Sequence, residues 1–228
     1  VVGRSTSAPW NGNAVIPSSV KVGDDRWPVR YMGDAVFEGD HTLKSFQTSS
    51  MLEGTGSFRS CTSLTDVVLG EGVTSLSGFE GCSALTNFEF LGPVDYVSDR
   101  AFAGCTSLHS LTLPSTVEWV RAEAFMGSGL ERIDLGGNVR YLEARAFKNC
   151  FNLKSIKGMD AVQTIPDECF AGSALEQFTI PANTSYIYST AFDGCERLYH
   201  LKVDQSNTRY FSHHGDVYGK AAYTDDIE

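Results

Sequence analysis

Six cysteines and five histidines are the side chains that could support redox, metal or acid–base chemistry in this chain. Five cysteines share one position of a recurring pattern: Cys61, Cys82, Cys105, Cys150 and Cys195. Serine stands at the equivalent positions Ser128 and Ser173, which indicates that the position needs a small side chain rather than a covalent bond. The pattern therefore favours free, buried thiols. A disulfide between neighbouring members of the row remains the alternative, because their Cα atoms could lie within bonding range.

Acid–base chemistry has one local candidate, the pair His213 and His214 beside Asp216. Adjacent residues of an extended segment point to opposite faces, so a polar surface turn is the favoured interpretation. The chain has no C-x-x-C, H-E-x-x-H, G-x-S-x-G, P-loop or G-x-G-x-x-G motif. We predict no catalytic residue, no metal site and no cofactor, and thus a protein that is not an enzyme. A deep pocket lined by converging ionisable groups would reopen that question.

The elements that position these side chains follow from an internal repeat. Eight phenylalanines recur every 21 to 23 residues: Phe37, Phe58, Phe79, Phe102, Phe125, Phe147, Phe170 and Phe192. Each of the last seven is followed by an L-x-x-L-x-L pattern, in which apolar and polar residues alternate at the end. One coil of about 22 residues cannot bury its own apolar side chains, whereas stacked coils bury a continuous core.

The repeat predicts a leucine-rich-repeat solenoid of about eight stacked repeats of ~22 residues, with little α-helix. Each L-x-x-L-x-L segment has the period of a short strand, so the strands should form a parallel β-sheet on the concave face. We expect the solenoid to span residues 14–204. Residues 1–13 would form an N-terminal segment and residues 205–228 a C-terminal capping or linking segment.

The pattern A-F-x-G-C-x-S-L-x-x-L-x-L-P, clearest from Ala101 to Pro114, resembles the BspA-type (Treponema pallidum type) leucine-rich repeats. The resemblance covers about residues 14–218. Two features depart from it. Lys157-Gly158-Met159 replaces the usual end of a strand, so that repeat should be irregular. The asparagine row of other leucine-rich repeats is absent, so the backbone groups at that corner need other partners.

Charge and hydropathy exclude several classes of partner. The chain has 18 Lys and Arg against 28 Asp and Glu, which gives a net charge of −10. This sign disfavours nucleic acid and anionic lipid. No apolar run approaches the roughly 20 residues that span a bilayer, so we expect no membrane insertion.

The outward positions of the predicted strands are the candidate binding residues, because a long polar sheet face suits a macromolecule better than a small substrate. They are Asp66, Asn87, Glu89, Thr112, Arg132, Asp134, Lys157, Gln177, Thr179, His200 and Lys202. These side chains could also serve only to keep the sheet soluble. Trp119 occupies a position that is usually small or polar, and it is the best candidate for an exposed aromatic side chain.

The resemblance implies a function that the residues alone do not. Proteins with BspA-like repeats are associated with bacterial attachment to host matrix proteins such as fibronectin and fibrinogen. We therefore expect a protein-interaction or adhesion module, at the cell surface or secreted, that binds host or extracellular-matrix proteins or glycans, as a monomer. The first residues show no signal-peptide pattern, so the location rests on the resemblance alone. The alternative is a structural spacer or accessory domain of a larger surface protein, with no ligand of its own.

Overall fold

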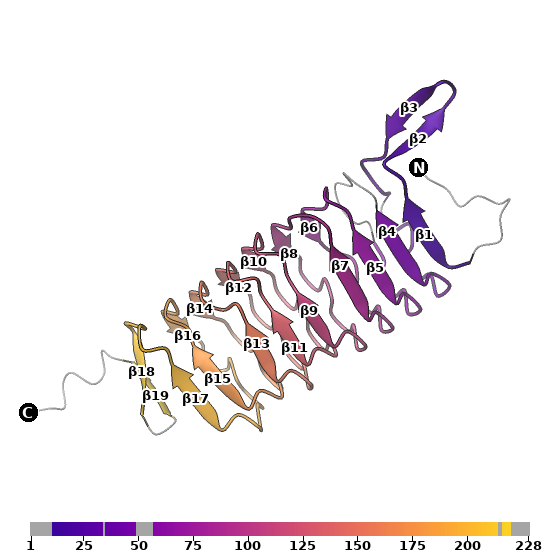
Figure 1. Ribbon diagram of the computed structural model, residues 1–228. Coiled ribbons are helices and arrows are strands. Elements are labelled where there is room, and N and C mark those ends of the chain that lie inside the picture. Colours follow the sequence, from indigo (N-terminus) through magenta and orange to yellow (C-terminus); the bar gives the residue numbers. More distant parts are fainter. Residues whose placement is uncertain (1–10, 34, 49–56, 214–215, 220–228) are drawn as a thin grey trace, which may run out of the picture.

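The computed structural model describes residues 11–33, 35–48, 57–213 and 216–219, and these form a β-solenoid (Figure 1). No residue in those ranges belongs to a helix. One face carries the longer strands: β1 (Asn13–Ile16), β4 (Ser45–Thr48), β5 (Asp66–Leu69), β7 (Asn87–Phe90), β9 (Ser110–Thr112), β11 (Arg132–Asp134), β13 (Ser155–Lys157), β15 (Gln177–Ile180) and β17 (His200–Val203). Their outer surface is called the long-strand face below.

A second row of two-residue strands runs along another side of the solenoid, called the short-strand face. It consists of β6 (Ser75–Leu76), β8 (Tyr96–Val97), β10 (Trp119–Val120), β12 (Tyr141–Leu142), β14 (Thr164–Ile165) and β16 (Tyr186–Ile187). All pairings within the two rows are parallel. The predicted parallel solenoid is therefore confirmed.

Strand formation follows the alternation in the sequence. In β11, Ile133 points inward and is buried, whereas Arg132 is exposed. Ile133 is in register with Leu111 of β9 and Ile156 of β13, so equivalent side chains lie one above another. A slip by one residue would turn the apolar side chains outward, and this penalty fixes the register.

The eight repeat phenylalanines form one internal ladder with seven turns of the coil between its ends. Successive rings are stacked, with centroids 5.0 to 5.6 Å apart. The rings of Phe102 and Phe125 are almost parallel, with an interplanar angle of 1°. Burial of each ring contributes about 1.5–3 kcal/mol to the stability of the fold, so the ladder is a main source of the stacking energy between coils.

The cysteine row supplies hydrogen bonds between neighbouring coils at the corner that precedes the long strands. The Sγ of Cys105 donates to the carbonyl of Phe79 at 3.1 Å, and Cys150 does the same to Phe125. All six cysteines are free, and five are buried. Burial raises the pKa of these thiols, to about 12 for Cys82.

Charged side chains form another ladder along a corner of the solenoid. Arg100 pairs with Glu80 on one side and with Glu123 on the other. Arg145 continues the alternation, with Glu123 behind it and Glu168 ahead. These side chains are 22 to 46% exposed, so the ladder is partly screened by solvent.

Antiparallel hairpins lie near the two ends of the solenoid. The strands β2 (Ser19–Val22) and β3 (Asp25–Pro28) form one, which stands off the N-terminal end in Figure 1. The other is formed by β18 (Tyr210–His213) and β19 (Asp216–Gly219) and follows β17. The repeat pattern predicts only parallel strands, and residues 19–28 lie outside it, so neither strand of the first hairpin was predicted. Gly23, at φ +65°, permits the tight turn of this hairpin.

Candidate binding surface on the long-strand face

All eleven candidate residues lie on long strands, and each side chain is exposed or half-buried. The alternation of strand positions explains this, because the inward neighbours of these residues fill the core. The sequence thus identified the outward row correctly.

At the N-terminal part of the face, Asp66 and Asn87 are in register on neighbouring strands. The side-chain amide of Asn87 donates to Asp66 at 2.6 Å, and the hydroxyl of Thr65 also donates to that carboxylate. These bonds, chiefly the one from Thr65, lower the pKa of Asp66. Glu89 lies two residues further along β7, opposite Val68.

The remaining candidates fall into two groups. Thr112, Asp134 and Lys157 are in register on β9, β11 and β13, and Arg132 lies on the same sheet. On the last two strands, Gln177 is opposite His200, and Thr179 is opposite Lys202. The structure does not bring the three groups together as one sheet, because the ladder of backbone hydrogen bonds is interrupted twice.

The interruptions lie between β7 and β9 and between β13 and β15. Elsewhere on this face, a backbone N–H at the start of each strand donates to the carbonyl just before the preceding strand, as Ser155 does to Glu131. Within the described ranges, no such bond joins Gln177 to Lys154. The two breaks are called the β7–β9 break and the β13–β15 break.

Core side chains are half-exposed at both breaks. Phe88 and Phe90 of β7 and Ile156 of β13 are only partly buried, whereas Val67, at the inward position of β5, is 1% exposed. A cavity of about 460 Å³ lies at each break. The sheet is therefore open at these two places, and its apolar floor and unpaired strand edges are accessible to solvent.

Gly158 lies at the end of β13, beside the second break. It stands where the other repeats carry the last inward apolar residue of the strand, and its φ is +72°. A Cβ at this position would lie 2.8 Å from the backbone nitrogen of Gly137, one coil back. The chain thus turns away early and approaches the preceding coil closely. The irregularity predicted at Lys157-Gly158-Met159 is present here.

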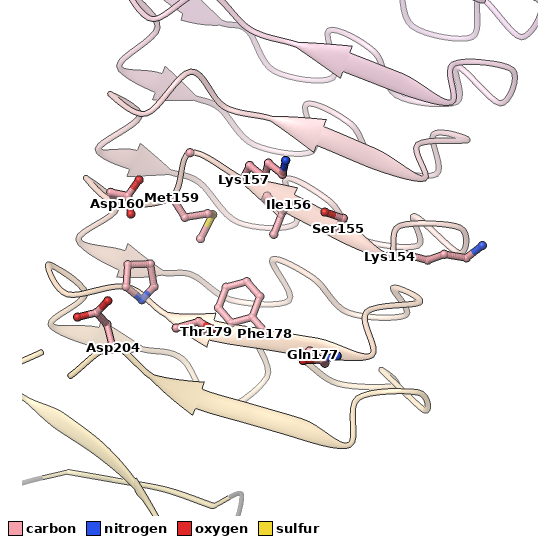
Figure 2. Close-up of a pocket in the computed structure, with 12 residues that line it drawn as sticks. Lys154, Ser155, Ile156, Lys157, Met159, Asp160, Gln177, Phe178, Thr179 and Asp204 are labelled. Atoms are coloured by element: carbon pink, nitrogen blue, oxygen red, sulfur yellow. The ribbon is translucent and has the colours of Figure 1, made fainter. Parts of the chain in front are cut away.

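The cavity at the β13–β15 break, called the β13–β15 groove, has an apolar floor and charged rims. Figure 2 shows Ile156 and Met159 from one side and Phe178 from the other, in the space between the two strands. Lys154 lies where β13 begins, and Asp160 lies at the other end. Three of the eleven candidates line the groove: Lys157, Gln177 and Thr179.

Sequence reasoning missed Lys154 and the apolar floor. Ile156 and Phe178 were placed in the core, since their positions in the repeat are inward. The available signal was the glycine at position 158 in place of a leucine. It indicated irregularity but not an opening, because the separation of neighbouring coils depends on the backbone path.

Exposed aromatic side chains gather on the short-strand face instead. Trp119 is 40% exposed, as expected, and it stacks on Tyr141 with ring centroids 4.1 Å apart. The guanidinium of Arg121 lies 5.2 Å above the ring of Tyr96. Tyr96, Trp119 and Tyr141 are in register on β8, β10 and β12, so their contacts stabilise that row and lie off the candidate surface.

Among the described residues, no group of three or more His, Cys, Asp and Glu side chains could hold a metal ion. The same part of the chain contains no helix long and apolar enough to cross a bilayer. The side chains of His213 and Asp216 and all of His214 lie outside the described residues.

The repeat pattern described as the BspA type leucine rich repeat region matches residues 25–78 and 75–199, in six copies. The chain belongs to the BspA-type leucine-rich repeat family. This family and its fold are generally non-enzymatic. A comparison with curated proteins found no match.

Solved structures of other leucine-rich repeat proteins show the same fold. A protein from Bacteroides ovatus is 22% identical with a TM-score of 0.64, and the alignment covers 85% of this chain and 46% of that one. The T. pallidum leucine rich repeat protein is 23% identical with a TM-score of 0.63, over 71% and 76% of the chains. The chain thus spans about half the length of the first of these relatives.

Proposed function

We propose that this solenoid is a non-enzymatic protein-interaction module of a cell-surface or secreted protein, and that it binds macromolecules through the long-strand face. The observation that carries the proposal is the row of outward polar side chains on the parallel long strands. Such an extended face contacts a large partner at many points without ordering loops first, which reduces the entropic cost of binding.

Adhesion to host or extracellular-matrix proteins or glycans is the form of this function that the BspA-type family supports. The acidic net charge is compatible with such partners and unfavourable for nucleic acid. The solenoid would act as a monomer, without insertion into a membrane.

A spacer or accessory domain without its own ligand is the second candidate. The continuous ladder of eight stacked phenylalanines favours it, because a rigid rod of this kind holds other domains at a fixed distance. The two candidates differ in whether substitutions on the long-strand face weaken any binding.

The test is binding to immobilised fibronectin, fibrinogen and a panel of host glycans at physiological salt. The double variant Asp134→Lys/Lys157→Glu exchanges two opposite charges that are in register on β11 and β13. The matched control, Glu118→Arg/Arg140→Glu, exchanges two charges on consecutive coils of the short-strand face, where the N–H of Arg140 donates to the carbonyl of Glu118. Both variants keep the net charge, and circular dichroism checks that they fold.

Saturable binding that the first variant loses and the control keeps would support the proposal. Binding that both variants keep would place the site away from these charges and contradict the assignment to the long-strand face. Absence of binding to the whole panel would overturn the adhesion form and favour the spacer.

A further inference from the structure

We propose that the β13–β15 groove binds an extended acidic peptide segment of a partner protein, which adds as a strand between β13 and β15. This inference rests on the proposed function, because it names the kind of partner that the long-strand face takes. Strand addition uses main-chain hydrogen bonds for affinity and alternate side chains for specificity.

The direction of the backbone groups is the first argument. The N–H of Ser155 donates to Glu131, and the carbonyl of Lys157 accepts from Leu135, so both residues face β11. Peptide groups alternate along a strand, and Ile156 between them therefore directs its N–H and C=O toward β15. No strand pairs with that edge of β13 in the described structure.

The opposite edge of the groove has the same property. The N–H of Asp204 donates to the carbonyl of Ile180, so Ile180 and, by alternation, Phe178 face β17. Gln177 and Thr179 then direct their backbone groups toward β13. The groove thus presents unpaired donors and acceptors from both sides, the arrangement that accepts an additional strand.

The floor and rim of the groove define the side chains of the peptide. Ile156 is half-buried, and Phe178 and Met159 are 5% and 7% exposed, so alternate apolar side chains of the peptide would pack against them. The ammonium groups of Lys154 and Lys157 are exposed, and neither makes an ion pair in the described structure. Acidic side chains of the peptide would pair with these two lysines, whereas the other end of the groove, which Asp160 and Asp204 line, would face uncharged residues of the peptide.

The β7–β9 break provides an internal comparison. Its cavity has the same volume, about 460 Å³, and an apolar floor that includes Phe88. Its only charged lining residue is Glu89, and no lysine or arginine lines it. An acidic peptide would be repelled there, so charge directs it to the β13–β15 groove.

The probe is the synthetic peptide acetyl-Glu-Val-Glu-Val-Thr-Val-amide, fluorescently labelled and titrated by anisotropy against the full chain. A twin peptide carries N-methyl groups on every second amide, which removes hydrogen-bond donors and leaves the side chains unchanged. Each backbone hydrogen bond contributes about 1 kcal/mol, so the loss of two or more of them should weaken binding of the twin peptide by at least about tenfold. Equal binding of the two peptides would overturn strand addition without the need for any protein variant.

Protein variants locate the site. Thr179→Pro removes an N–H that faces the groove and leaves the pairing of β15 with β17 intact, so it should weaken peptide binding about tenfold. The matched control is Thr112→Pro, which removes the corresponding N–H at the β7–β9 break. Equal effects of the two substitutions would contradict the assignment to the β13–β15 groove.

The double variant Lys154→Glu/Lys157→Glu tests the choice of an acidic peptide. It should abolish detectable binding of the acidic probe at physiological salt, and unchanged affinity would overturn the charge assignment. If the wild-type chain binds a matrix protein but not the probe peptide, only this inference is refuted. If the wild-type chain binds neither, the proposed function is refuted as well.

Discussion

The Sγ of Cys105 lies 3.1 Å from the carbonyl oxygen of Phe79, one coil back, and donates a hydrogen bond to it. The same contact recurs along the row, so buried thiols act here as structural donors between coils. This relationship explains why five cysteines share one repeat position in a chain where they do not form disulfides.

Replacement of Cys105 by alanine should destabilise the solenoid by about 1–3 kcal/mol, because it leaves a buried acceptor unpaired and a small cavity. Cys105→Ser should cost less, since Ser128 and Ser173 show that a hydroxyl is accepted in this row. Urea unfolding followed by circular dichroism measures both. Equal losses for the two variants would show that the hydrogen bond contributes nothing.

Stability should fall as the pH rises above about 9. Burial raises the pKa of Cys61 and of Cys150 from the ordinary value of 9.0 to about 11, and that of Cys82 to about 12. Between pH 9 and these values the unfolded chain releases thiol protons that the folded chain retains, which favours the unfolded state.

The urea midpoint at a series of pH values from 8 to 10.5 measures this effect. In Cys82→Ser the decline should be shallower, because one titrating thiol is absent. Identical slopes in the variant and the wild-type chain would attribute the alkaline loss to other groups.

Arg100 should make a modest and salt-dependent contribution to the free energy of unfolding. Arg100→Gln removes two ion pairs of a side chain that is 46% exposed, for a loss of about 1 kcal/mol or less. Arg100→Glu places three carboxylates in succession, so it should lower the free energy of unfolding further. Because salt screens the repulsion, 0.5 M NaCl should reduce the difference in the free energy of unfolding between the two variants. Arg132→Glu, outside the ladder, is the control. A loss with no salt dependence would point to packing rather than charge.

Gly158→Ala should destabilise the chain more than Gly127→Ala. Both glycines have positive φ, +72° and +66°, where alanine costs about 1–2 kcal/mol. Only at Gly158 would the added Cβ also meet backbone atoms, at 2.8 Å, whereas nothing lies within 4 Å at Gly127. The difference between their thermal midpoints isolates the cost of the close approach. No difference would mean that the coils can move apart at this point.

The sequence was sufficient to predict the repeat, the inward and outward positions of the strands, and the internal row that Phe79 and its equivalents form. Leu76 lies only three residues before Phe79, whereas most repeats have five residues at this step. Both side chains are nevertheless buried, and β6 pairs with β8. These features depend on local period, which a single chain displays directly.

The two breaks in the sheet could not be predicted in the same way. Ile156 and Ile133 occupy the same repeat position, yet one is half-buried and the other 2% exposed. Ile133 lies on a strand that is paired on both sides, whereas the edge of β13 toward β15 is unpaired, and the pattern of apolar residues does not distinguish the two positions. The candidate residues were therefore found, but their division into three groups was not.

Amide hydrogen exchange tests most directly whether the sheet is open between β13 and β15. Gln177 and Thr179 should exchange rapidly, whereas Phe178 and Ile180, which face β17, should be protected. This alternation along one strand would confirm the unpaired edge that the groove requires. Equal protection of all four amides would show that β15 is paired on both sides in solution, and would contradict the opening on which the proposed peptide site depends.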